Sequence, residues 1–121
     1  MEKQEMKIKL NILLETETIT NIAYDVSNKT FDYLSGKYKK QSLDGSDMFW
    51  THLCMALTRI ERGETLEGPS ENIMKEINQT PYKDDIEEII SFVNAQLNQK
   101  LPKEERDFFY LHLHGVIENN K

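Results

Sequence analysis

The fold of this protein is decided by residues 47–63, which read DMFWTHLCMALTRIERG. Apolar side chains recur in this stretch at steps of four, three, one and three residues, which places them on one face of a helix. Two arginines stand near its end, where positive charge interacts favourably with the helix dipole, and Gly63 follows as a C-terminal cap. Ser46, in the turn before it, is a candidate N-cap. These features predict a helix over residues 47–62.

The same periodicity continues along most of the chain and predicts four further helices. They cover residues 16–34, residues 71–79, residues 84–99 and a last segment that begins with Pro102. Gly36 is predicted to end the first of them. Pro81 is predicted to end the second, because the residue before a proline is pushed out of the helical region.

The N-terminal residues 7–14 fit two structures. Isoleucine and leucine alternate there as in a strand, but Leu10, Leu13 and Leu14 fit a short helix equally well. No later segment offers a partner strand, so a helix is favoured. The fold class is predicted to be all-α, a compact five-helix bundle in a single domain. That domain spans residues 1–121, with a core at about 16–118 and a segment 1–15 of uncertain structure.

Composition excludes several classes of protein. The chain has 121 residues, of which 21 are acidic and 15 basic, giving a net charge of −6. Nucleic-acid binding relies on a basic face, so direct contact with nucleic acid is not expected. Cys54 is the single cysteine, which excludes an internal disulfide and a cysteine zinc cage and favours a reducing cytoplasm. No window approaches the ~20 apolar residues of a membrane span.

Candidate chemistry is confined to three histidines, because the chain has no phosphate-binding glycine loop and no serine nucleophile motif. His112 and His114 would share a face on a strand and could then hold a metal, as in a metal-dependent hydrolase. On a helix they would point in nearly opposite directions. His52 borders an apolar stripe two turns before Arg59, and Glu105 lies two turns before His112.

Two segments around these histidines resemble the histidine motifs of the PTS regulation domain (PRD) family. Residues 101–112 read LPKEERDFFYLH, which resembles the second motif: Leu-Pro, an acid, an aromatic residue three positions later, and Leu-His. Residues 51–60 read THLCMALTRI and, with Gly63, look like the first motif, in which arginine follows histidine by seven residues. The resemblance covers residues 16–118.

The resemblance implies a five-helix bundle that tends to dimerise and that is phosphorylated on histidine by components of the sugar phosphotransferase system. His52 and His112 match the phospho-acceptor positions, while Arg59 and Glu105 would supply flanking charges. The implied phosphate donors are histidine phosphocarrier or sugar-permease components. Such domains usually belong to transcription regulators or antiterminators, so neither an enzymatic activity nor a cofactor is expected of this chain.

Two departures from the family pattern keep a second interpretation open. Thr51 stands before the first histidine, where the family often has an aspartate that could orient the imidazole. The sequence also contains neither a nucleic-acid-binding segment nor a second copy of the domain. It is therefore a stand-alone domain, as Met1 suggests, or a fragment. The alternative function is a helical adaptor or dimerisation domain that is not phosphorylated.

The sequence also yields two spatial predictions. His52 and His112 should lie close together near one surface, since both border apolar stripes. Trp50, Phe109 and Tyr110 extend the aromatic surface beyond their stripes, which predicts a patch that a homodimer would cover.

Overall fold

The helix predicted over residues 47–62 forms as α3 (Asp47–Arg62) and lies against three others, α1, α2 and α6. It ends where Gly63 adopts a left-handed φ of 72°, a conformation that favours glycine. Ser46 occupies the N-cap position, but its side chain makes no cap hydrogen bond. Its hydroxyl instead donates to the Leu43 carbonyl at 2.7 Å and accepts from Trp50 Nε1 at 2.9 Å, which anchors the buried indole.

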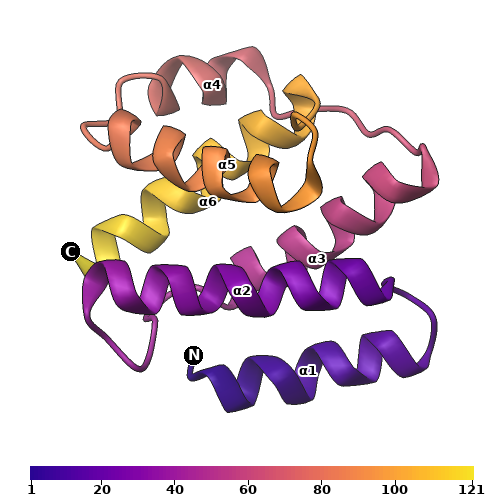
Figure 1. Ribbon diagram of the computed structural model, residues 1–121. Helices are drawn as coiled ribbons and strands as arrows, with labels where there is room; N and C mark the ends of the chain where they lie inside the picture. The colour runs from indigo at the N-terminus through magenta and orange to yellow at the C-terminus, as the bar shows by residue number, and fades with distance from the viewer.

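The computed structural model describes all of residues 1–121 and contains six α-helices (Figure 1). The only β-type pairing is one isolated bridge between Glu2 and Ser42. The all-α fold class is therefore confirmed, while the count of five helices is one too low. The helices are α1 (Lys3–Glu15), α2 (Asn21–Tyr38), α3 (Asp47–Arg62), α4 (Glu71–Ile77), α5 (Lys83–Leu97) and α6 (Lys103–Asn120).

The additional helix is α1, in the segment whose structure was uncertain from sequence. Met6 and Leu10 are fully buried one turn apart, whereas Ile8 and Ile12 are more than half exposed. The alternating pattern is thus incidental, and the helical spacing decides which side chains reach the core. Helix α1 runs alongside α2 and also contacts α3 (Figure 1).

Helix α2 is displaced toward the C-terminus from its predicted position. Its N-cap is Thr20, whose side chain accepts a hydrogen bond from the Ala23 backbone at 3.2 Å. Residues 16–19 form the turn from α1 instead of a first helical turn. Gly36 does not end the helix, which continues to Tyr38 and stops where Lys39 takes a left-handed φ of 54°. A glycine with nothing packed beside it is tolerated in a helix interior at modest cost.

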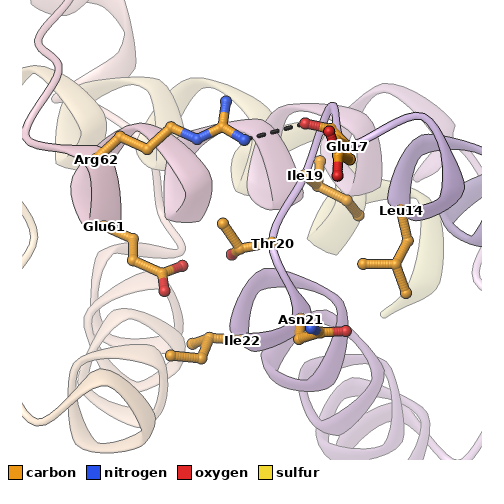
Figure 2. Close-up of a pocket in the computed structure, with 8 residues that line it drawn as sticks. All are labelled: Leu14, Glu17, Ile19, Thr20, Asn21, Ile22, Glu61 and Arg62. Carbon is orange, nitrogen blue, oxygen red and sulfur yellow. Dashed lines mark hydrogen bonds between the residues drawn. The ribbon is translucent and has the colours of Figure 1, made fainter.

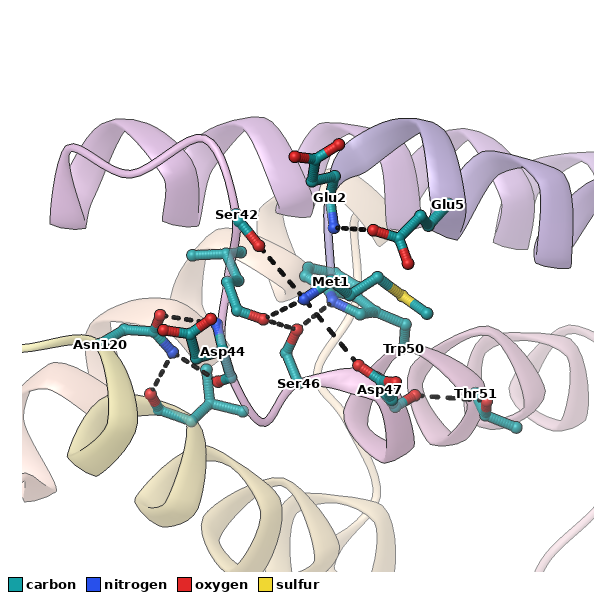
Figure 3. Close-up of polar contacts among 12 residues, drawn as sticks. Met1, Glu2, Glu5, Ser42, Asp44, Ser46, Asp47, Trp50, Thr51 and Asn120 are labelled. Atoms are coloured by element: carbon teal, nitrogen blue, oxygen red, sulfur yellow. Dashed lines mark hydrogen bonds and ion pairs between the residues drawn. The ribbon is translucent and has the colours of Figure 1, made fainter.

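Polar contacts hold the loop before α3 against both ends of the chain (Figure 3). The buried Asn120 side chain, on the last turn of α6, accepts from Asp44 N and donates to Asp44 O, both at 2.8 Å. The amino group of Met1 donates to the Leu43 carbonyl at 2.7 Å. These contacts set the position of α3 relative to α6, the two helices that carry the histidines.

The predicted exposed aromatic patch does not exist. Trp50 and Phe109 have no exposed surface and Tyr110 is 6 % exposed, because the rings pack inside one chain. Phe49 makes edge contacts with both Trp50 and Phe109, at centroid distances of 4.9 and 6.0 Å. Aromatic rings in such pairs contribute to the core of the monomer, so they supply no surface for a second copy.

No helix has both the length and the apolar character needed to cross a bilayer.

Candidate functional site

His52 on α3 and His112 on α6 face each other across the contact between these helices. Their ring centroids are 4.9 Å apart, with the planes inclined by 35°. Phe108, one turn before His112 on α6, lies 4.9 Å from the His52 ring and closes one side of the pair. The prediction that the two histidines lie close together is confirmed.

The two imidazoles line a small open pocket of about 230 Å³. The other side chains that line it all come from α3. They are Met48, Thr51, Met55 and Arg59. Sequence reasoning missed the two methionines, although Met48, His52 and Met55 follow one another at steps of four and three residues and so share a helix face. Met48 is 70 % exposed, which leaves an apolar rim beside the histidines.

Arg59 and Glu105, which the sequence predicted as charges flanking the histidines, pair with each other. They form a two-pronged ion pair between α3 and α6, in which Arg59 Nε and Nη2 donate to the two carboxylate oxygens at 3.0 and 3.1 Å. The Glu105 side chain is 2 % exposed and that of Arg59 is 21 % exposed. A carboxylate this deeply buried needs a partner of opposite charge, which Arg59 provides.

The same carboxylate lies beside His52, with Glu105 Oε1 3.6 Å from His52 Nε2. Burial by itself raises the pKa of Glu105, but the His52 ring and the Arg59 guanidinium outweigh it and hold the pKa below its ordinary value. Glu105 is therefore ionised at neutral pH. Sequence spacing placed Glu105 two turns from His112, yet its closest histidine is His52, because the pairing depends on how α3 and α6 pack.

His112 is held in its neutral form. Burial, followed by the nearby His52 ring, lowers the pKa of His112 from its ordinary value of 6.5. Unlike His52, His112 has no buried ring nitrogen that lacks a hydrogen-bond partner. A neutral imidazole has a free lone pair on one nitrogen and can act as a nucleophile near pH 7.

His114 belongs to a different environment from His112. Its Nδ1 lies 2.7 Å from the Thr80 hydroxyl, and its ring is 5.5 Å from that of Tyr82. Since residues 103–120 form a helix, the two histidines diverge, and the shared metal site of the hydrolase interpretation has no geometry to support it. No group of three or more His, Cys, Asp or Glu side chains is placed to hold a metal ion.

A larger hollow lies at the opposite end of α3, beside the turn between α1 and α2 (Figure 2). Its volume is about 680 Å³, and Arg62 spans one side by donating to the Glu17 carbonyl at 3.0 Å. Glu61 and Glu17 line it, but no histidine or cysteine does. Its one hydroxyl, on Thr20, is engaged as the N-cap of α2, so the histidine pocket is the candidate site.

Comparison with known proteins places the chain in a class of regulatory module. A family model, the PRD domain, matches residues 45–116, which is more than half of the chain and includes both pocket histidines and the ion pair beneath them. The chain belongs to the PRD family, whose members are regulatory domains of the sugar phosphotransferase system rather than catalysts. No curated protein and no solved structure matches it.

Proposed function

We propose that this domain is a phosphorylation-responsive interaction module in which His52 and His112 accept phosphoryl groups. The observation that carries the proposal is the meeting of the two imidazoles, 4.9 Å apart, in one open pocket that Arg59 also lines. The donors are histidine phosphocarrier or sugar-permease components, acting in the cytoplasm. The domain supplies the nucleophile, and the donor supplies the transfer chemistry.

Phosphorylation at this pocket would act directly on the ion pair. A phosphohistidine carries close to two negative charges, which attract the Arg59 guanidinium and repel the Glu105 carboxylate. Arg59 uses two of its five N–H donors on Glu105, so the remaining donors are available to the phosphoryl oxygens. Any loosening of the ion pair leaves a buried carboxylate without compensation, at a cost of a few kcal/mol.

The contact between α3 and α6 is therefore where phosphorylation would be converted into a change of shape. A coupling of ~1–3 kcal/mol is typical of such switches, and the cost of a weakened buried ion pair is of that size. The exposed Met48, at the rim of the same pocket, would then report the change to a docked protein, including a second copy of this chain.

The His52 ring can be oriented even though the usual aspartate before it is replaced by Thr51. Thr51 makes a hydrogen bond to the Asp47 carbonyl and is not directed at the imidazole. Glu105 lies against Nε2 of His52 instead. A carboxylate from α6 would thus orient the ring in place of the aspartate, which supports phosphorylation of His52.

Incubation with an active phosphotransferase cascade tests the proposal. Acid-labile phosphate should appear in the natural protein and disappear when His52→Ala and His112→Ala are combined. His114→Ala is the matched control, since it removes a histidine from the same helix but outside the pocket. Full incorporation in the double variant would place the acceptor at another residue and contradict the proposal, whereas no incorporation in the natural protein under any donor would favour the adaptor function.

A further inference from the structure

The two ring nitrogens of His52 lie in different environments. Nε2 is buried, has no hydrogen-bond partner and lies 3.6 Å from Oε1 of Glu105. Nδ1 also has no hydrogen-bond partner, but it is not buried, and the ring lines the open pocket. A molecule arriving from solvent therefore reaches one nitrogen of this ring and not the other.

Glu105 cannot easily turn away from Nε2, because both of its oxygens accept hydrogen bonds from Arg59. Burial of the carboxylate leaves no solvent to replace those bonds. An ionised carboxylate beside an imidazole nitrogen favours a proton on that nitrogen and disfavours a lone pair, as in carboxylate–histidine pairs that fix the tautomer of a metal ligand. Neutral His52 consequently carries its proton on Nε2 and its lone pair on Nδ1.

We infer that Nδ1 of His52 is the atom that accepts the phosphoryl group, and that Glu105 is the positioning residue that fixes this choice. The inference rests on the proposed function. In the transfer, the Nδ1 lone pair forms a bond to phosphorus while the donor's N–P bond breaks and its electron pair stays on the donor imidazole. Nε2 keeps its proton throughout, so no further reactant is needed.

Phosphorylation at Nε2 is opposed by both space and charge. It would place a dianionic group against the carboxylate of Glu105, in a position from which water is excluded. His112 has no carboxylate within ion-pair distance and no buried unpartnered nitrogen, so the selection applies to His52. Glu105 therefore restricts phosphorylation of His52 to Nδ1, whereas no carboxylate selects between the two ring nitrogens of His112.

Nuclear magnetic resonance distinguishes the alternatives in two steps. In the unphosphorylated natural protein, long-range proton–nitrogen correlations of the imidazoles should show the His52 proton on Nε2. In a His112→Asn variant, phosphorylated through the cascade, the phosphorus–nitrogen coupling should identify the Nδ1 isomer at His52. A proton on Nδ1, or a phosphoryl group on Nε2, would overturn the inference.

A Glu105→Gln variant separates positioning from mere support of the fold. The amide keeps the size of the side chain but removes the charge, so the Nδ1–H tautomer of His52 should gain population and the Nε2 phospho-isomer should appear. An unchanged tautomer ratio in a folded variant contradicts the positioning role, and if the variant does not fold, the tautomer of the natural protein decides. Absence of phosphate on His52 in every variant would instead overturn the proposed function, while the tautomer would still test Glu105.

Discussion

Replacing Arg59 with methionine should destabilise the domain far more than an ordinary surface substitution. The change leaves the 2 % exposed Glu105 side chain without the guanidinium that holds both of its oxygens. Breaking a buried pair from one side costs about 3–5 kcal/mol. Arg59 itself is 21 % exposed, and solvent screens part of the interaction, so we expect a loss of about 2–4 kcal/mol.

Urea unfolding followed by the fluorescence of Trp50 measures this loss, since Trp50 is the single tryptophan and is fully buried. With an m value of about 2 kcal/mol per M, the midpoint should fall by about 1–2 M. Arg106→Met is the matched control, because Arg106 pairs with Glu87 where the two side chains are 41 and 33 % exposed. That change should cost about 1 kcal/mol or less.

Two further measurements identify the buried charge as the cause. Arg59→Met combined with Glu105→Met should recover most of the lost stability, because a buried pair replaced by apolar side chains is often neutral. The destabilisation by Arg59→Met alone should shrink as pH falls through about 4.5, the ordinary pKa of a glutamate, since protonation neutralises Glu105. A loss equal to that of Arg106→Met, or one independent of pH, would show that the buried charge of Glu105 is not the cause.

Four other predictions follow from the same structure. Gly63→Ala should cost about 1 kcal/mol because φ is 72° there, whereas Gly36→Ala, inside α2 with open space beside it, should stabilise by about 0.4–1 kcal/mol; thermal unfolding compares them. Because the pocket rings are 4.9 Å apart, two dianionic groups would repel by about 2–3 kcal/mol even at the dielectric constant of water, so intact mass should show one phosphoryl group per chain. The lowered pKa of His112 means that the folded state resists protonation there, so its contribution to stability should decline as pH falls through 6.5, and the decline should be absent in His112→Asn. A homodimer stays a prediction, although the aromatic patch that motivated it is absent. Light scattering should report a mass above the 14.2 kDa of one chain, and a mass equal to it would contradict the dimer.

Local signals in the sequence were sufficient for most of the helices. The stripe of α3 and its glycine stop are properties of consecutive residues, and the structure reproduces their ends residue for residue. The start of α2 was misplaced because Thr16 and Thr20 are both plausible N-caps, and Thr16 in fact ends α1 as its C-cap. Gly36 was misread because a glycine ends a helix only when its backbone turns left-handed, which here happens at Lys39.

The sequence was sufficient to place both histidines and Arg59 together in the candidate site, but not its two methionines or its pairings. Seven-residue spacings placed a charge near each histidine, but they do not specify which charges meet across two helices. The packing of α3 on α6 brings Glu105 to Arg59 and His52 rather than to His112. The same packing buries Phe109, which sequence reasoning assigned to the surface, because apolar periodicity does not reveal how many neighbours cover a helix.

Phosphate counting on five proteins tests whether the pocket shared by His52 and His112 accepts phosphate. After exposure to the cascade, the natural chain and His114→Ala should each carry acid-labile phosphate. His52→Ala and His112→Ala should each still accept phosphate at the remaining histidine, and the combined variant should carry none. Phosphate retained in the combined variant, or lost only in His114→Ala, would contradict the claim that this pocket is the site.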